Sequence, residues 1–125
     1  MPRQWTAFPP NSLPIVWVHL AQRRFRVLVD TGAARSLITP AVASSLGLRI
    51  VGTERIIGVT GAVVSVPLVE VSGVGVGQID LSPFQAGVLE LAPLRLGIQA
   101  ILGVNAFAGH RLQVDFPAGR LYLLQ

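Results

Sequence analysis

The chain has 125 residues, which is long enough for one domain with its own core and too short for two. It contains no cysteine, which excludes a disulfide framework, a thiol nucleophile and a Cys-ligated metal. Hydrophobic residues make up 51% of the chain and charged residues only 13%, so a protein interface or a lipid phase must cover much apolar surface.

A membrane helix is the weaker of these two explanations. The longest uncharged run near the middle of the chain, residues 56–69, is shorter than a bilayer span and contains Gly58, Gly61 and Pro67. Prolines also interrupt the N-terminal region, which lacks the layout of a signal peptide. We therefore expect a self-associating domain without membrane insertion, either cytoplasmic or a soluble part of a longer or anchored protein.

The formal net charge is +4, and all ten basic residues are arginines. They are scattered along the sequence, except for the cluster of Arg23, Arg24 and Arg26. A solvated surface is the favoured interpretation of this cluster, ahead of contact with a nucleic acid or an acidic substrate.

The first elements in chain order are an arm and a hairpin. Residues 1–14 are rich in proline and aperiodic, so we expect an extended N-terminal arm. Residues 15–20 and 25–29 are β-branched and aromatic runs joined by a polar connection at residues 21–24, which predicts a β-hairpin.

A short helix is predicted over residues 41–46. Thr39 is a good N-cap, Pro40 suits the first helical position, and Gly47 closes the end.

A second hairpin is predicted after this helix. Residues 55–57 and 62–66 are apolar strands on either side of the four-residue tip 58–61, which begins and ends with glycine. We expect this tip to be mobile.

The rest of the chain continues in short strands. Further strands are predicted at residues 68–71, 77–81, 85–89 and 100–102, and a last hairpin at residues 112–116 and 120–124. The glycine-rich residues 73–77 lack the Lys-Ser/Thr of a phosphate loop, so they predict a turn. Residues 104–108 suggest one or two helical turns. Short strands separated by turns favour an all-β fold over alternating βαβ units.

Asp30 is the most unusual residue of this pattern, because it directly follows three apolar strand residues. Asp is depleted in strands, and burial of its charge is costly unless the group is paired or hydrogen-bonded. An Asp that caps a turn with its own side chain is the alternative, and the tripeptide Asp30-Thr31-Gly32 alone would favour it. The sequence also contains a weak internal similarity, because residues 27–32 and 100–103 are both apolar strands that end at a glycine.

Residues 27–38 closely resemble the active-site signature of the retropepsin-like aspartic protease family. Residues 56–61 resemble its glycine-bounded flap hairpin, and residues 100–107 resemble its second signature, with the three motifs in the family's order. The resemblance covers almost all of residues 15–125, taken as the domain. It implies an all-β, closed, six-stranded type of acid protease barrel with one or two short helices.

The resemblance also implies a homodimeric aspartic endopeptidase that hydrolyses peptide bonds. Two carboxylates that share one proton are needed, and the chain has a single Asp-Thr-Gly motif, so Asp30 would face its own copy across a two-fold axis. Thr31 would brace the paired turns, and Gly32 would let the substrate backbone approach. Substrate-binding positions implied are Leu28, Ala33, Ala34, Gly58, Val59, Thr60, Gly61 and Ile101. No metal or organic cofactor is implied.

Two positions depart from the retroviral members of the family. Those members carry an acidic residue and an arginine that pair with each other, where this chain has Ala34 and Val104. The loss of both partners avoids an unpaired buried charge. It suggests a cellular or bacterial branch rather than a viral enzyme.

Two other functions remain as alternatives. A catalytically weak or inactive peptide-binding dimer of the same fold would keep the cleft without turnover. A basic β-barrel that binds nucleic acid is suggested only by the net charge, and we expect no nucleic-acid partner. His19 and His110 have no second ligand at suitable spacing, so we interpret them as surface or turn residues rather than metal ligands.

Overall fold

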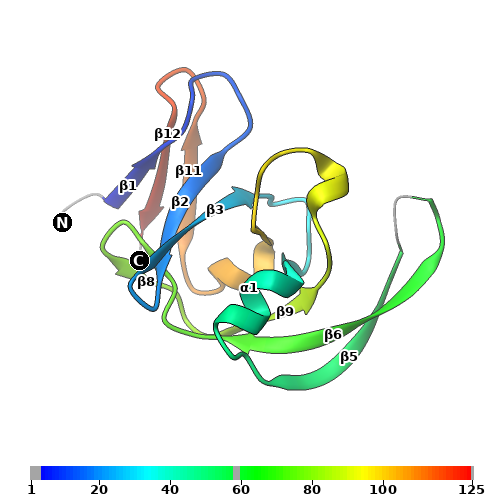
Figure 1. The fold of residues 1–125 in the computed structure, drawn as a ribbon. Helices are drawn as coiled ribbons and strands as arrows, with labels where there is room; N and C mark the ends of the chain where they lie inside the picture. The colour runs from blue at the N-terminus through cyan, green and yellow to red at the C-terminus, as the bar shows by residue number, and fades with distance from the viewer. Residues whose placement is uncertain (1–3, 58–59, 125) are drawn as a thin grey trace.

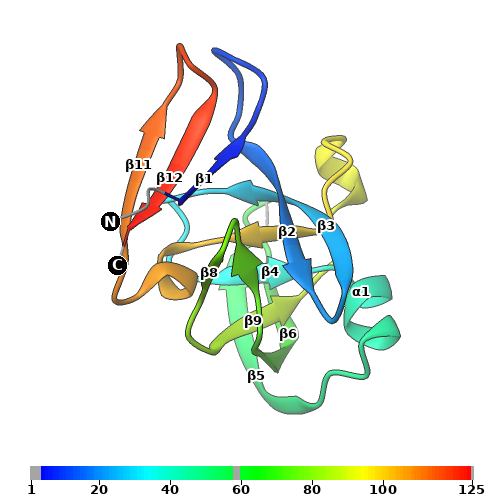
Figure 2. The same ribbon diagram turned by 90° about the vertical axis from the view of Figure 1, so that its left-hand side faces the viewer.

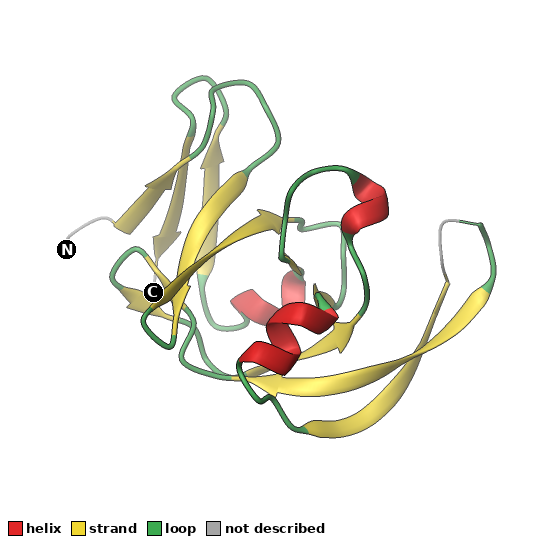
Figure 3. Cartoon of the chain, viewed as in Figure 1, coloured by secondary structure: helices red, strands yellow, loops and turns green. Residues whose placement is uncertain are grey.

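The structure is a computed structural model that describes residues 4–57 and 60–124. Strands are its main regular elements, with one short α-helix and two 3-10 turns in the described residues, so the predicted all-β class is confirmed (Figures 1 and 3). The elements in chain order are β1 (Gln4–Ala7), β2 (Ile15–Leu20), β3 (Arg23–Val29), β4 (Ser36–Ile38), α1 (Pro40–Ser45), β5 (Ile50–Ile57), β6 (Val63–Val71), β7 (Gly75–Val76), β8 (Ile79–Asp80), β9 (Phe84–Val88), η1 (Ala92–Leu94), β10 (Ala100–Leu102), η2 (Val104–Phe107), β11 (Arg111–Asp115) and β12 (Arg120–Leu124).

The strands form two sheets. Nine of them follow one another in the order β5-β6-β9-β4-β10-β3-β2-β7-β8, and the other three in the order β1-β12-β11. Most neighbours are antiparallel, but β3 runs parallel to β10, and β4 runs parallel to β9. These two parallel pairs lie at the centre of the larger sheet, and they bring the end of β3 beside the end of β10.

The β2–β3 hairpin is confirmed, with a tighter turn than the sequence suggested. Only Ala21 and Gln22 connect the strands, and both have positive φ angles, 51° and 62°. A two-residue turn of this kind matches the twist of the strands it joins. As a result β3 begins at Arg23, inside the polar segment that we expected to be a loop.

The predicted helix is also confirmed. The Thr39 hydroxyl accepts a hydrogen bond from the Val42 amide at 3.3 Å, and Pro40 is the first helical residue. Gly47 follows the end of the helix with φ +62°, a conformation that glycine adopts without strain.

The second hairpin is longer than predicted. β5 and β6 pair from Ile57 and Val63 back to Ile50 and Val69, and they form a two-stranded arm on the side away from the β1-β12-β11 sheet (Figure 1). The strand predicted at residues 68–71 is therefore the end of β6. Two of the tip residues, Gly58 and Val59, lie outside the described residues, so the predicted mobility of the tip stays a prediction.

The glycine-rich run differs from the prediction. Gly75 and Val76 form the short strand β7, which pairs with β8 and with His19 of β2, so the run is not entirely a turn. The strand predicted at residues 77–81 shortens to β8, and β9 lies one residue before the strand predicted at residues 85–89.

The two ends of the chain pair with each other. The last hairpin, β11–β12, is confirmed, with β11 one residue earlier than predicted, and β1 adds to it with Gln4 opposite Leu123. Figure 2 shows this three-stranded sheet beside the larger one. The sequence indicated only an extended arm at residues 1–14, because β1 has its hydrogen-bonding partner more than one hundred residues away.

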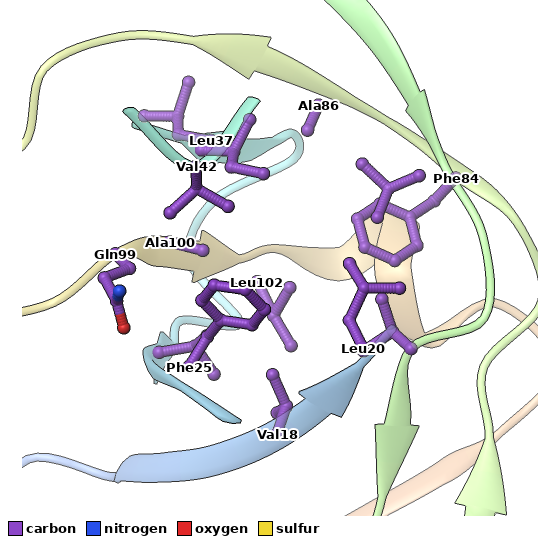
Figure 4. A pocket seen from close by; sticks show the side chains of 14 residues that line it. Val18, Leu20, Phe25, Leu37, Val42, Phe84, Ala86, Gln99, Ala100 and Leu102 are labelled. Atoms are coloured by element: carbon purple, nitrogen blue, oxygen red, sulfur yellow. The ribbon is translucent and has the colours of Figure 1, made fainter. Parts of the chain in front are cut away.

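The hydrophobic core lies between the two sheets and α1. Its least exposed large side chains include Val16, Val27, Val69, Leu121 and Leu123. A cavity of about 30 Å³ remains inside the larger sheet, and apolar side chains converge on it (Figure 4). Because a water molecule needs several polar partners, this void is a packing feature of the core. Among the described residues, no helix is long and apolar enough to cross a membrane.

Candidate active site

Asp30 directly follows β3, and its side chain is half-buried. Its backbone amide donates to the Leu102 carbonyl at 3.0 Å, and its own carbonyl accepts from the Ala33 amide at 3.1 Å. The Gly32 amide donates to Oδ1 of the carboxylate at 3.0 Å. The turn that follows the carboxylate thus holds it in one orientation. Because the side chain is only half-buried, a ligand can reach it.

The parallel pairing of β3 and β10 explains the internal similarity between residues 27–32 and 100–103. Val29 lies opposite Leu102, so both strands end at the same level, one at Asp30 and the other at Gly103. A Cβ atom on Gly103 would lie 2.5 Å from the Ala33 carbonyl oxygen, which is closer than real contacts allow. The absence of a side chain at Gly103 lets the loop after Asp30 pack directly on the end of β10.

A buried hydrogen-bond network fixes this junction. The Ser36 hydroxyl donates to Oδ1 of Asn105 at 2.8 Å and accepts from the Gly103 amide at 3.0 Å. Nδ2 of Asn105 donates in turn to the Gln85 carbonyl at 2.6 Å. Asn105 was not among the predicted site residues. The one signal in the sequence was that Asn105 lies two residues after Gly103 in the second motif. This signal did not identify Ser36 or Gln85 as its hydrogen-bond partners.

The predicted apolar positions Leu28, Ala33 and Ile101 do lie together. They belong to a second hydrophobic cluster with Leu91 and Ile98, which come from the segment between β9 and β10. Ile101 is only 8% exposed in the single chain, whereas Leu28 and Ala33 are half-buried. Leu28 and Ala33 are therefore the predicted wall positions that a substrate can reach in this conformation. Sequence reasoning missed the contribution of Leu91 and Ile98.

Gly58 and Val59 lie outside the described residues, and the other remaining predicted positions are on the surface. Thr31, Gly32 and Ala34 are exposed in the loop after β3, and Thr60 and Gly61 are exposed at the end of the β5–β6 arm. The Thr31 hydroxyl makes no hydrogen bond within the described part of the chain. It is therefore available to a partner outside this single chain.

An ion pair joins the loop after β3 to the arm. Nε of Arg35 lies 2.8 Å from Oε1 of Glu54 on β5, and the two side chains are 46% and 23% exposed. Ala34 and Val104, which replace the charged pair of the retroviral members, are both exposed. No charge is left buried by their replacement, and the electrostatic contact of this loop is the one between Arg35 and Glu54.

Metal ligands are not gathered anywhere in the described residues, where no three His, Cys, Asp or Glu side chains lie close enough to hold an ion. His19 is exposed on β2, as expected for a surface residue. His110 is half-buried before β11, and its Nδ1 atom is buried without a hydrogen-bond partner in the described residues.

The paired strand ends, the Asp-Thr-Gly loop and the two-stranded arm define an aspartic-protease type of fold. A family model described as aspartyl protease matches residues 16–106, which is most of the chain, and the chain belongs to this family. Its fold is similar to that of a retropepsin-like aspartic protease from Rickettsia conorii known from a crystal structure. That match has a TM-score of 0.61, 16% sequence identity and 99% coverage of both chains. No curated protein sequence matches the chain.

Proposed function

We propose that the chain is an aspartic endopeptidase that hydrolyses peptide bonds as a homodimer, with Asp30 as its catalytic carboxylate. The observation that carries this proposal is the half-buried Asp30 carboxylate, oriented by the Gly32 amide at the end of β3. Membership of the aspartyl protease family supports the class of reaction.

The need for a dimer follows from the number of carboxylates. Aspartic protease chemistry uses two, and the chain has one Asp-Thr-Gly motif. A two-fold axis beside the Asp30 loop supplies the second from an identical chain. The surface at this loop supports such an interface, because Val104 is 54% exposed although it is apolar, and its amide donates to the Ala33 carbonyl at 2.8 Å.

The mechanism uses one proton shared between the two carboxyl groups, because two like charges in contact do not both ionise. The charged carboxylate takes a proton from a bound water as the water oxygen attacks the peptide carbonyl carbon. The other carboxyl group gives its proton to the carbonyl oxygen, which forms a tetrahedral diol. The carboxyl group that took the water proton then gives it to the leaving nitrogen as the C–N bond breaks. The other carboxylate takes a proton from a hydroxyl of the diol, so that the pair again holds one proton.

The surrounding residues would position the substrate. Thr31 would hydrogen-bond across the two-fold axis, for which its exposed and unpaired hydroxyl is suited. Leu28 and Ala33 would contact apolar side chains on either side of the scissile bond. The arm tip, including Thr60 and Gly61, would close over the substrate and exclude water, as lids do in many enzymes.

Substitution of Asp30 tests the proposal. Asp30→Asn removes the only carboxylate of the motif in each protomer, so cleavage of a denatured protein mixture should fall by at least about a thousandfold in acidic buffer. Asp80→Asn, which changes an exposed aspartate on β8, serves as the control and should keep full activity. Peptidase activity that survives Asp30→Asn would refute the assignment.

The wild-type chain also distinguishes the proposed enzyme from an inactive peptide-binding dimer of the same fold. If the wild-type chain binds peptides without cleaving them across a wide pH range, the cleft is a binding site and the enzymatic proposal is wrong.

A further inference from the structure

The outer face of the β2–β3 hairpin carries an aromatic and cationic surface. The strand register sets Trp17 opposite Arg26 and His19 opposite Arg24. Trp17 is 41% exposed, and the guanidinium carbons of Arg24 and Arg26 lie 4.4 Å and 5.9 Å from the centroid of its ring. We call Trp17, Arg24 and Arg26 the Trp17 patch.

Among the described residues, no carboxylate neutralises the positive charge of the patch. All six acidic residues are in the described part of the structure, and the ion pair found there joins Arg35 to Glu54. Neither Arg24 nor Arg26 has a carboxylate within 4.0 Å. Both side chains are exposed, so a carboxylate from another molecule can reach them at little desolvation cost.

A groove of about 460 Å³ lies beside the patch. It is lined by Phe8 and Leu13 of the N-terminal segment and by Ile15, Trp17 and Arg26 of the hairpin. A mostly apolar lining that includes the Arg26 cation fits a peptide segment that has both apolar and acidic side chains.

One residue of the groove, Ile15, also adjoins the candidate active site. Ile15 lines the groove and also packs in the hydrophobic cluster that contains Leu28 and Ala33. Asp30 follows Arg26 by four residues along extended backbone, which spans about 13 Å at the rise of a β-strand. An extended peptide covers the same distance in about four residues.

Arg26 is also held firmly at the backbone. Its amide donates to the side-chain oxygen of Gln99 at 3.0 Å, and the Gln99 amide donates to its carbonyl at 2.8 Å. The patch therefore lies on hydrogen-bonded strands of the larger sheet rather than on a loop.

From these observations we infer that the Trp17 patch receives an acidic flank of the peptide substrate, about four residues from the scissile bond. This inference rests on the proposed function, because it takes Asp30 as the point of cleavage. In a two-fold dimer the patch occurs twice, so acidic residues are favoured on both sides of an apolar core. The arginine cluster, which the sequence suggested to be solvated surface, thereby becomes a specificity-determining element.

A nucleic acid fits the patch less well. Single-stranded nucleic acids bind along a positively charged groove that follows several phosphates, with successive bases stacked on aromatic rings. Here two arginines lie against one tryptophan, and their guanidinium groups already contact the ring on which a base would stack. The residues that line the adjoining groove are mostly apolar.

The test uses two peptide pools with the same randomised apolar core, flanked on both sides by glutamates in one pool and by glutamines in the other. For the wild-type chain at low salt, kcat/KM should be about fivefold higher for the glutamate pool per favourable ion pair, since an exposed pair contributes up to about 1 kcal/mol. The preference should shrink at high salt because exposed charges are screened.

Two variants assign this preference to the patch. Arg24→Gln combined with Arg26→Gln should bring the ratio between the pools close to one. Arg49→Gln removes an exposed arginine between α1 and β5, outside the groove, and should leave the wild-type ratio unchanged. Equal cleavage of both pools by the wild-type chain, or a preference that persists in the double variant, would overturn the inference.

A binding measurement separates this inference from the proposed function. In Asp30→Asn, fluorescence anisotropy of labelled pools should show tighter binding of the glutamate pool, and this difference should disappear in the triple variant with both arginines replaced. Preferential binding without any wild-type cleavage would refute the protease assignment alone. Equal binding of the pools, together with arginine-dependent binding of an oligouridylate, would make the patch a nucleic-acid site and refute the inference.

Discussion

Gly103 determines how closely the two halves of the Asp30 site approach each other. Its φ of −91° and ψ of −172° describe extended backbone that any residue adopts, so its conformation does not require glycine. The lack of space at this position does require glycine, because the carbonyl oxygens of Ala33 and Arg35 would lie 2.5 Å and 2.7 Å from a Cβ atom. Both obstacles are backbone atoms, which cannot rotate away as a flexible side chain would.

Gly103→Ala should therefore lower the free energy of unfolding by about 2 kcal/mol, the usual range for overpacking. Urea denaturation measures this change. Gly52→Ala on β5 is the matched control, because its new Cβ would meet only a side-chain carbon of Leu68 at 3.9 Å, an ordinary contact. If both variants have the same midpoint, the proposed close packing at Gly103 is wrong.

Ser36 is the residue on which the buried network depends. It is fully buried, and its hydroxyl both donates to Asn105 and accepts from the Gly103 amide. Removal of the hydroxyl leaves the buried Gly103 amide and the partly buried Oδ1 atom of Asn105 without these partners, which costs more than the lost bonds themselves.

Ser36→Ala should destabilise the chain by about 2 kcal/mol through these unsatisfied groups. Thermal and urea unfolding of the variant provide the measurement. Ser44→Ala on the exposed side of α1 is the comparison and should change stability by less than about 0.5 kcal/mol. Equal effects of the two substitutions would show that the network contributes little.

At the scale of elements, the Arg35–Glu54 ion pair connects the loop after β3 to the arm strand β5. An exposed pair of this kind is weak, because water and salt screen it and both side chains lose freedom. We therefore expect the pair to contribute little to the stability of the fold.

A double-mutant cycle with Arg35→Gln and Glu54→Gln should give a coupling free energy of about 0.5 kcal/mol in low salt. The coupling should fall toward zero as the salt concentration approaches about 1 M. A cycle between Arg35 and Arg55, whose side chain alternates to the opposite face of β5, should show no attraction. A coupling that does not respond to salt would contradict an electrostatic contact.

At the scale of the whole molecule, the exposed apolar surface beside the Asp30 loop matches the high hydrophobic content of the sequence. The chain leaves several large apolar side chains exposed, and Val104 adjoins the site itself. Because Val104 is already exposed in the single chain, a charge there should disturb an interface without disturbing the fold.

Val104→Asp should convert the proposed dimer to a monomer and abolish peptide cleavage, because the charge would be buried without a partner. Sedimentation equilibrium reports the state of assembly, and circular dichroism reports the fold, which should be retained. Ser44→Asp on α1 is the control with the same added charge. A wild-type chain that is fully active as a monomer would refute the two-fold mechanism.

Local signals were sufficient where an element is defined by its own residues. Thr39 and Pro40 predicted the start of α1, and the apolar runs on either side of residues 21–24 predicted the β2–β3 hairpin. The same signals failed for β7, because two strand residues inside a glycine-rich run carry no recognisable period.

The sequence by itself determined the all-β class, the order of the motifs and the family to which the chain belongs, since these depend on short patterns of apolar residues, turns and Asp30-Thr31-Gly32. Only the tertiary structure decided which residues meet. The Ser36–Asn105 bond, the Arg35–Glu54 pair and the pairing of β1 with β12 join residues far apart in the chain. Such contacts arise from how strands stack and pair in space, and no local periodicity encodes them.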